Sequence, residues 1–465
     1  MALSASGRFE ALAAAVIVAV AAASAGALLI VEPRPLTVVA TQPLDGADGV
    51  PFRARILLTF SRPVDEGTVN GAVTVEPATE GFVSAAGRRV VFAPRSVFRA
   101  DRDYRVTIGT GLRDRAGRSL REPMAIRFRT RGLGLVVRTD DGRLLRARLV
   151  GAQAQVAAEP LAGPGAGEFA LSTAGDLAYV HLADGRLVIQ PSGGAAPRSI
   201  PLPKSEVRDL AWAPGRTLIG FVAARRDGTI LPYLIELPRA GAPVEPFGLP
   251  PDQIALNTSA VDAARKRSIL ERVHGRETFA FAPDGRGIIA RDRKWDFVVF
   301  GFDGTLRGTL GPFLAVGNAS PRGEFVALVD VDPGDGRLRR QVIVYERSGR
   351  LRPLSAPDRD SHSPRFSDRS DRVVYATAEA SGPPEGRRFA LETFDLSSGA
   401  RRRLTEPPPG ASDEDPQWSP DDGWITFRRV PVGDPRRGQV WIVRAEGGDA
   451  RPLSVPGAVA ARWVP

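Results

Sequence analysis

Short runs of alternating apolar and polar residues dominate this chain from residue 35 onward. The clearest runs lie at 56–60, 104–108 and 124–128, where every second residue is Ile, Leu, Val, Met, Tyr or Phe. Period-two alternation is typical of antiparallel strands with one buried face. Turn residues such as Asp45-Gly46 and Ala116-Gly117 separate the runs. Residues 35–131 are therefore predicted to form an immunoglobulin-like β-sandwich of about seven strands.

The N-terminal segment has a different pattern, because residues 11–31 are apolar without interruption or charge. As a helix this segment would be about 31 Å long, close to the thickness of a bilayer's hydrocarbon core. The sequence predicts a transmembrane anchor at 11–31, with residues 1–10 as a short cytoplasmic tail. A cleaved signal peptide is the alternative, since Ala23-Ser24-Ala25 fits a small-residue cleavage site. Both interpretations place the rest of the chain outside the cytoplasm.

The remaining residues, 132–465, contain a repeated phrase. An aromatic or apolar residue, a small residue, Pro or Asp, and a Gly turn precede an apolar strand, most clearly at Trp418–Phe427. The corresponding turn positions fall at 173, 214, 283, 321, 368 and 420, so the intervals are 41, 69, 38, 47 and 52 residues. Repeats of about 40–50 residues are typical of four-stranded propeller blades. The fold class is thus predicted to be mainly β, with a β-propeller over 132–465.

The two ends of this region suggest how the ring closes. Leu135–Leu149 reads as a hairpin that lacks an innermost strand, and Val459–Pro465 reads as an innermost strand with no sheet of its own. Pairing the two segments would complete one further blade and remove the open edges. We therefore prefer seven blades, with six or eight as alternatives.

The 69-residue interval between positions 214 and 283 exceeds one blade. Its best helical stretch is Ala260–Arg272, which is basic. The segment at 255–275 is interpreted as an insertion on one face of the propeller, with a degenerate extra blade as the alternative. As an insertion, it could contact a partner, because long loops on rigid scaffolds carry binding.

Composition excludes several classes of protein. The chain has no cysteine, so it has no disulfides, thiolate nucleophile or Cys-ligated zinc. The net charge is +10, but its arginines are scattered rather than gathered in one basic stripe, which argues against nucleic-acid binding. Asp residues of the first domain, such as Asp45 and Asp114, are interpreted as turn caps rather than calcium ligands.

A search for catalytic arrangements finds no nucleophile elbow, zinc-binding helix motif or phosphate-binding loop. We predict that the protein is not an enzyme and has no cofactor or metal. Five residues are candidates for binding loops on a propeller face: Asp360, His362, Asp413, Glu414 and Asp415. Five tryptophans at repeat positions are interpreted as packing between blades: Trp212, Trp418, Trp424, Trp441 and Trp463.

Two segments resemble known families. The stretch 42–51 (QPLDGADGVP) and Leu58–Asp65 (LTFSRPVD) resemble bacterial Ig-like domains of the S-layer type. Leu404-Thr405 with Ser412–Asp421 (SDEDPQWSPD) resembles the TolB-type, WD-like propeller repeat of bacterial envelope proteins. The first resemblance implies a spacer or adhesive module without catalysis. The second implies a propeller, a fold that also precedes the catalytic half of prolyl-oligopeptidase-like enzymes.

Together these observations predict a membrane-anchored, extracytoplasmic binding or scaffold protein of the bacterial envelope. Its predicted partner is an unidentified protein, peptide or envelope polymer. Two alternatives remain open. One is a propeller-type hydrolase or lyase with a site at the channel mouth, and the other is a structural component of a surface layer or an adhesion system.

Overall fold

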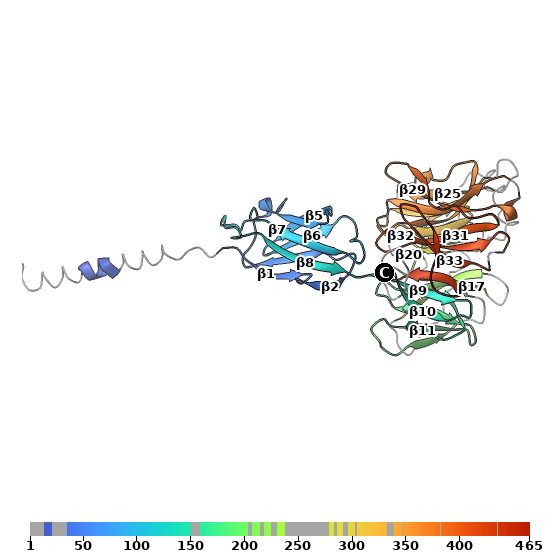
Figure 1. Cartoon of the computed structure of the whole chain (residues 1–465), viewed down its shortest axis with the longest axis horizontal. Helices are drawn as coiled ribbons and strands as arrows, with labels where there is room; N and C mark the ends of the chain where they lie inside the picture. The colour runs from blue at the N-terminus through green and yellow to red at the C-terminus, as the bar shows by residue number, and fades with distance from the viewer. Residues whose placement is uncertain are drawn as a thin grey trace, which may run out of the picture. The chain divides into compact units, whose positions relative to one another are not determined.

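A computed structural model describes residues 14–20, 35–149, 159–202, 207–213, 218–224, 230–237, 279–282, 286–291, 296–302, 305–332, 339–346, 348–381, 383–434 and 436–465. The chain divides into two compact units (Figure 1). The first comprises Met1–Ser96 and Asp103–Arg129, and the second comprises Val97–Arg102 and Thr130–Pro465.

The predicted N-terminal anchor is described only in part. Residues 14–20 form a short helix with exposed side chains, and the rest of 11–31 lies outside the described residues. Within the part of the chain that the structure describes, no helix has the length and apolar character needed to span a bilayer.

The first unit is built from two antiparallel four-stranded sheets. One sheet has the order β1 (Val38–Gln42), β3 (Ile56–Phe60), β6 (Arg89–Pro94) and β5 (Gly81–Ala86). The other has the order β2 (Ala47–Val50), β8 (Met124–Thr130), β7 (Asp103–Ile108) and β4 (Val73–Glu76). A 3-10 turn, η1 (Glu66–Thr68), follows the N-cap Asp65. This arrangement confirms the predicted sandwich.

The core of this sandwich is formed by the apolar residues that the alternating pattern of the sequence predicted to be buried. Ile56, Leu58 and Phe60 on β3 are fully buried, and Val106 and Ile108 on β7 are buried with them. The residues between them on β3, Leu57 and Thr59, are only half-buried. One face of each strand therefore stabilises the unit by removing apolar surface from water.

The described part of the second unit contains seven antiparallel sheets. Their strands, in hydrogen-bonded order, are β11 (Glu159–Ala162), β10 (Leu144–Leu149), β9 (Leu133–Thr139) and β35 (Ala458–Trp463); β12 (Ala166–Leu171), β13 (Leu177–His181), β14 (Arg186–Gln190) and β15 (Arg198–Pro201); β16 (Val207–Trp212), β17 (Leu218–Ala224) and β18 (Ile230–Glu236); β19 (Ala280–Phe281), β20 (Gly287–Arg291), β21 (Phe297–Gly301) and β22 (Leu306–Gly311); β23 (Ala315–Ala319), β24 (Phe325–Asp332), β25 (Arg339–Glu346) and β26 (Leu351–Pro353); β27 (Arg359–Phe366), β28 (Arg372–Glu379), β29 (Ala390–Asp395) and β30 (Arg401–Arg403); and β31 (Ala411–Trp418), β32 (Trp424–Pro431), β33 (Gln439–Arg444) and β34 (Arg451–Pro452). A 3-10 turn, η2 (Pro384–Gly386), precedes β29.

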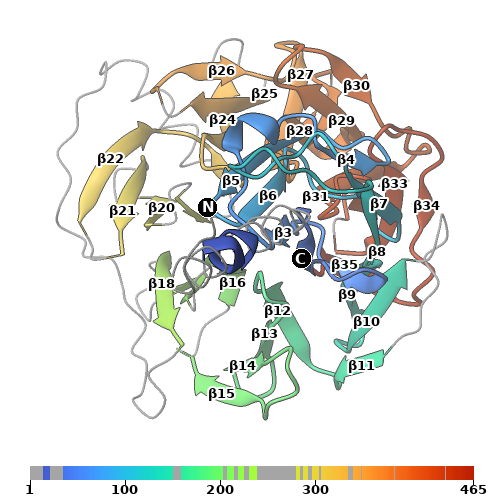
Figure 2. The ribbon, with the colours of Figure 1, turned by 90° about the vertical axis from the view of Figure 1, so that its left-hand side faces the viewer.

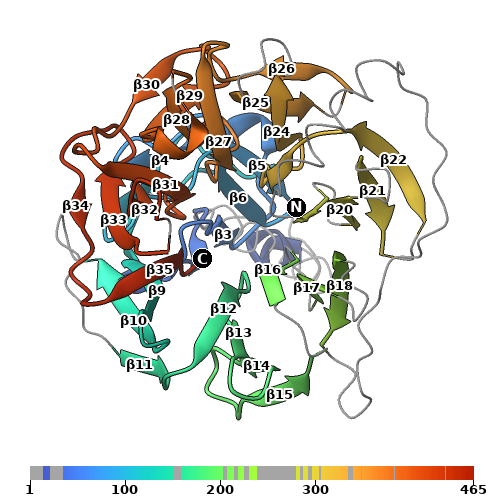
Figure 3. The same ribbon diagram turned by 90° about the vertical axis from the view of Figure 1, so that its right-hand side faces the viewer.

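These sheets resemble propeller blades. They follow one another around a central axis in chain order, with one edge strand of each sheet nearest the axis (Figures 2 and 3). The innermost strands include β12, β16, β27, β31 and β35 (Figure 3). Buried apolar side chains fill the space between neighbouring sheets; Ile425 and Phe427 of β32, for example, pack with Val374 and Ala376 of β28. The predicted insertion at 255–275, including Ala260–Arg272, lies outside the described residues.

The ring closes as the sequence predicts. The last strand, β35, pairs antiparallel with β9, and Trp463 lies opposite Leu135 in this ladder. Leu135, Ala461 and Trp463 are buried at this junction. One sheet therefore combines the first and last strands of the second unit, so that β9 is paired on both sides and β35 is not left without a sheet.

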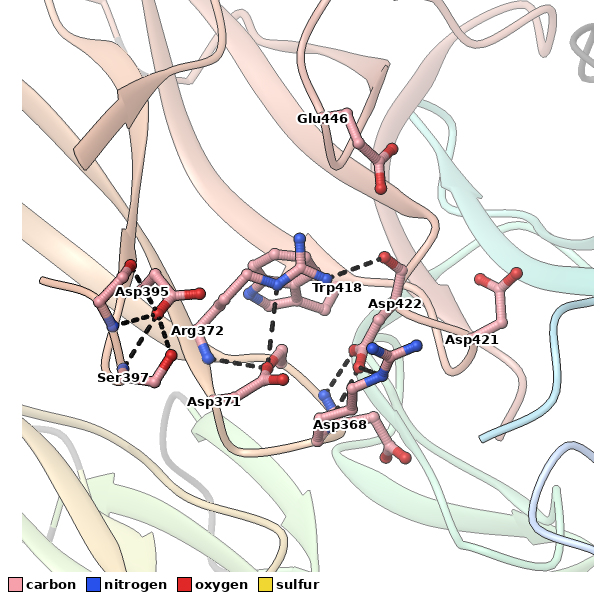
Figure 4. A network of polar contacts seen from close by, with 12 residues as sticks. Asp368, Asp371, Arg372, Asp395, Ser397, Trp418, Asp421, Asp422 and Glu446 are labelled. Carbon is pink, nitrogen blue, oxygen red and sulfur yellow. Dashed lines mark hydrogen bonds and ion pairs between the residues drawn. The ribbon is translucent and has the colours of Figure 1, made fainter. Parts of the chain in front are cut away.

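A polar network links the turns of two neighbouring sheets (Figure 4). Asp422, which is fully buried between β31 and β32, accepts hydrogen bonds from the backbone N–H groups of Asp368 (2.6 Å) and Arg369 (3.1 Å). The guanidinium of Arg372, on the sheet that contains Asp368, lies 4.8 Å above the ring of Trp418. This network joins the repeat turn of one sheet to that of the preceding one.

Burial raises the pKa of Asp422 to about 6, although the N–H of Arg369 and the guanidinium of Arg372 favour the charged form. An unfolded aspartate has a pKa near 3.9. Between these values the folded protein binds more protons than the unfolded one, so this carboxyl's contribution to stability is lost as pH rises through the window. We expect Asp422→Asn to cost about 1 kcal/mol of unfolding free energy at pH 4.5, because the amide accepts only one of the two bonds.

The cost of Asp422→Asn should disappear or change sign at pH 8, because only the wild type then carries the charged carboxylate. Urea unfolding of both proteins at the two pH values measures this difference. Groups that titrate in both proteins contribute equally to the two unfolding free energies and cancel in the difference. An equal difference between the two proteins at pH 4.5 and 8 would contradict the role assigned to Asp422.

Candidate functional site

The innermost strands share an irregularity close to the axis. In three of these strands, the pairing with the next strand is interrupted by two residues. The interruption lies between Arg208 and Ala211 in β16, between His362 and Arg365 in β27, and between Glu414 and Gln417 in β31. The first residue of each bulge, Asp209, Ser363 or Asp415, has a φ of +54°, +56° or +53°. Residues other than glycine rarely adopt this left-handed conformation, although Asp does so more readily than most. The repeated bulge gives each of the three strands the same local bend near the channel.

The five predicted site residues lie in strands, which corrects their assignment to loops. Asp360 and His362 belong to β27, whereas Asp413, Glu414 and Asp415 belong to β31. The sequence analysis interpreted these five residues as part of binding loops on a propeller face. The ladder instead continues on both sides of the bulge, so the bulge accommodates them.

Two of these residues form buried ion pairs. Asp360 is fully buried and accepts from Nε of Arg340 (2.7 Å) and from Nη1 of Arg387 (2.8 Å). Asp413 is also fully buried and accepts from Nε of Arg429 (2.6 Å), directly across the β31–β32 pair. Burial alone would raise the pKa of Asp360, but the bonds from Arg340 and Arg387 outweigh it and lower that pKa. These two aspartates hold strands together rather than facing a ligand.

His362 is held in the neutral form. Its ring lies edge-on to Phe389 with 4.6 Å between ring centroids, and its Nδ1 is 2.9 Å from Oγ of Ser363. Burial and, to a smaller extent, the neighbouring Arg340 lower the pKa of His362 to about 3, against the smaller opposing effects of Asp360 and Asp415. At neutral pH this side chain therefore has no proton to give as a general acid.

We expect the imidazole of His362 to stay neutral between pH 5 and 8, because burial disfavours the charged ring throughout this range. NMR spectra of labelled histidine, assigned by comparison with His362→Gln, would show carbon and nitrogen shifts that do not change with pH. A titration midpoint between 5 and 7 for this residue would contradict the environment described here.

Asp415 and Glu414 lie closer to the channel. Asp415 is half-buried, and its Oδ2 lies 3.3 Å from Nη1 of Arg428 on the neighbouring strand. Burial raises the pKa of Asp415, but Arg428, His362 and Arg365 outweigh this effect, so the carboxylate stays charged. Glu414 is half-buried and lies opposite Arg428 in the β31–β32 ladder.

The sequence analysis missed a set of charged residues near the axis. They come from several sheets: Arg138 on β9, Glu168 on β12, Asp209 on β16, Arg365 on β27, Arg428 on β32 and Arg462 on β35. All six are half-buried. A signal for part of this set was present, since Ser363-Pro364-Arg365-Phe366 and Asp415-Pro416-Gln417-Trp418 place a polar residue at the same step of the repeat.

These charges influence one another across the ring. Burial lowers the pKa of Arg365, with opposing effects from Asp415 and Asp209 and a further lowering from Arg462. Burial also lowers the pKa of Arg138, where Glu168 opposes it and Arg462 and Arg428 add to it. The sheets of Arg365 and Asp209 are not neighbours in the ring, so their interaction crosses the axis of the ring (Figure 3).

Tryptophans fix the register of the innermost strands that carry these charges. Nε1 of Trp418 donates to the carbonyl of Arg365 (3.0 Å), and Nε1 of Trp463 donates to the carbonyl of Gln417 (3.2 Å). Each bond joins one innermost strand to the preceding one. The interpretation of these two tryptophans as packing between blades is confirmed, and their indole donors also position Arg365 and Gln417.

Acidic residues of the first unit serve as turn caps. Oδ1 of Asp45 accepts from the N–H of Arg127 (2.7 Å), and Oδ1 of Asp114 accepts from the N–H groups of Ala116 and Arg118 (both 2.9 Å). Within the described ranges, no group of three or more His, Asp or Glu side chains is arranged to hold a metal ion.

Comparison with known proteins identifies the first unit and finds solved structures with a similar second unit. A model of the family described as "Bacterial Ig-like domain" matches residues 32–130. No curated protein matches the chain in sequence. Among solved structures, TolB from Acinetobacter baumannii is similar at 16% identity and a TM-score of 0.40, covering 71% of this chain and 82% of that one. A putative TolB from Agrobacterium tumefaciens is similar at 12% identity and a TM-score of 0.36, covering 69% and 88%.

A third solved structure, a putative 6-phosphogluconolactonase from Bacteroides uniformis, is similar at 15% identity and a TM-score of 0.43, covering 72% of this chain and 99% of that one. At these identities the likeness concerns the fold alone, and the case for a propeller is carried by the sheets and their closure. This chain contains a bacterial Ig-like domain at residues 32–130, followed by a region structurally similar to TolB-like β-propellers.

Proposed function

We propose that this protein is a binding protein of the bacterial envelope, in which a seven-bladed propeller binds its partner at the central channel. The observation that carries this proposal is the set of charged side chains that several sheets bring to the axis, among them Arg138, Arg365 and Arg462. Rigid scaffolds with converging polar groups are typical of binding sites.

The protonation states favour binding over acid–base catalysis. His362 is neutral at pH 7, whereas Asp360 and Asp415 have lowered pKa values and remain charged. A hydrolase or lyase needs a proton donor and a proton acceptor with pKa values near the working pH. These three groups do not supply such a couple, so we propose a protein without catalytic activity.

Affinity capture from an envelope extract tests this function. The full chain is compared with Arg365→Glu, which reverses one charge near the axis, and with Arg437→Glu, whose side chain is 85% exposed beside Asp434. We expect wild type and Arg437→Glu to retain the same component and Arg365→Glu to lose it. Equal recovery with all three proteins would place the binding surface away from the channel.

The N-terminal apolar segment supports a further part of the proposal. Residues 11–31 would anchor the chain in the membrane, with the Ig-like domain as a spacer and the propeller outside the cytoplasm. Protease treatment of intact spheroplasts, followed by membrane fractionation, tests this location. Protection of the propeller from protease in intact spheroplasts would contradict it.

A further inference from the structure

Three arginines near the axis lack the acidic partner that their neighbours have. Arg340, Arg387 and Arg429 all form ion pairs with buried aspartates. By contrast, within the described ranges no carboxylate lies within 4.0 Å of the guanidinium nitrogens of Arg138, Arg365 or Arg462. We call these three residues the arginine trio.

The hydrogen bonds of the trio leave most of its donors available. Nη1 of Arg365 donates to its own neighbour, the carbonyl of Pro364 (2.9 Å), and Nη1 of Arg462 donates to the carbonyl of Ala461 (3.0 Å). Nε of Arg138 is buried and has no hydrogen-bond partner among the described residues. Each guanidinium has five N–H donors, and a buried donor without an acceptor costs free energy.

The fold holds the trio in place. Arg365 and Arg462 lie on the innermost strands β27 and β35, one residue before the buried Phe366 and Trp463. The guanidinium of Arg462 also lies 5.6 Å from the ring centroid of Phe169 on the next sheet. Arg138, which belongs to β9, lies opposite Ala460 of β35 in the sheet that closes the ring. The three positive charges therefore come from two sheets, with Arg365 and Arg462 on innermost strands and Arg138 on the strand next to β35.

Repulsion among the three guanidinium groups is offset by Glu168, Asp209 and Asp415, none of which lies within ion-pair distance of the trio. Arg462 lowers the pKa of both Arg138 and Arg365, which shows that like charges lie within interaction range. Nearby carboxylates offset part of this charge, but Asp415 is already engaged by Arg428 at 3.3 Å. A guanidinium fork is suited to two parallel hydrogen bonds with a carboxylate or a phosphate.

We propose that the channel binds a small ligand through an oxyanion, a carboxylate or phosphate group, held by Arg138, Arg365 and Arg462. This inference deepens the proposed binding function and rests on it for the location of the site. The ligand would supply the acceptor that Nε of Arg138 lacks and a negative charge in direct contact with the trio. Binding of a small anion and capture of an envelope partner are separate measurements, so either can fail without the other.

The test uses the full chain and two probes, inorganic phosphate and citrate, with sodium chloride at matched ionic strength as the reference. Isothermal titration calorimetry and thermal unfolding measure binding. We expect at least one of the two probes to bind saturably and to raise the unfolding temperature beyond the chloride reference. Phosphate and citrate together distinguish a preference for phosphate from one for carboxylate.

The variants Arg365→Gln and Arg462→Gln should each weaken binding by about tenfold or more, since each removes a charge-assisted hydrogen bond. Without an anion, both should unfold at a temperature close to that of the wild type, because each also relieves repulsion within the trio. Arg437→Gln, on the exposed surface, should bind as the wild type does.

Arg462→Lys keeps the positive charge and serves as a second variant if a glutamine variant fails to fold. It should bind the anion less tightly than the wild type, because lysine lacks the planar guanidinium fork. The proposal is overturned if neither probe binds saturably to the wild type. Unchanged binding in Arg462→Lys and in whichever glutamine variants fold would overturn it as well.

Discussion

Removing the last strand should cost the second unit its cooperative fold. A chain that ends at Gly457 lacks the ladder between β35 and β9, including the pair of Trp463 with Leu135. It also loses the burial of Ala458, Ala461 and Trp463 and the bond from Nε1 of Trp463 to Gln417. We expect a loss of about 5 kcal/mol or more in unfolding free energy, together with association through the newly exposed edge of β9.

Two controls separate closure from the loss of one side chain. Trp463→Ala keeps the strand and should cost about 3–5 kcal/mol, as large truncations of buried aromatic residues do. A synthetic peptide covering residues 456–465, added to the truncated chain, should restore part of the lost stability. Urea unfolding and gel filtration measure both effects. Unfolding of the truncated chain at the same urea concentration as the full chain would show that closure does not stabilise the ring.

Asp360→Asn should have the largest effect of any single substitution of a charged residue. It leaves the guanidinium of Arg387, which is 1% exposed, without its carboxylate partner, and it also breaks the pair with Arg340. Removing one partner of a buried ion pair costs about 3–5 kcal/mol, because the remaining charge stays buried and loses the attraction of that carboxylate. Chemical unfolding at pH 7 measures this loss.

The cost of Asp360→Asn depends on pH in a defined direction. The pKa of Asp360 is lowered in the folded protein, so its stabilising effect is present above about pH 4 and is lost as pH falls below that value. The difference between wild type and variant should therefore shrink in acid. A difference that grows as pH falls would contradict the ion pair.

Matched variants complete this experiment. Asp434→Asn removes an exposed pair with Arg437 and should change stability by less than about 1 kcal/mol. Adding Arg387→Met to Asp360→Asn should recover part of the loss, because the buried charge that pairs with Asp360 in the wild type is then removed as well. If the double variant is no more stable than Asp360→Asn, the loss of unfolding free energy comes from the missing carboxylate and not from the buried charge of Arg387.

Much of the fold was accessible from the sequence because it depends on local patterns. Alternation identified the strands at 56–60 and 104–108, and the repeated turn phrase identified the sheets of the second unit. The pairing of the two ends could be inferred from strand count, since a hairpin and a lone strand each need a partner. Hydrophobic periodicity and turn chemistry act over a few residues, and these features therefore appear directly in the order of amino acids.

The candidate site could be predicted less well from the sequence, and the errors in its prediction have a physical cause. Asp360 and Asp413 look like exposed acidic loop residues in sequence, yet both are fully buried against arginines. The partners of Asp360, Arg340 and Arg387, lie 20 and 27 residues away, in the neighbouring sheet and in the segment before β29. The order of residues along the chain does not show which acidic side chain will pair with which arginine.

The sequence by itself determined the strands, their grouping into repeats and the strand that closes the ring. Only the tertiary structure decided which charged residues form ion pairs and which, like Arg138, Arg365 and Arg462, have no carboxylate at ion-pair distance among the described residues. The reason is physical: strand formation depends on neighbours within a few residues. The energy of a charge near the axis depends instead on groups that separate sheets bring together through space.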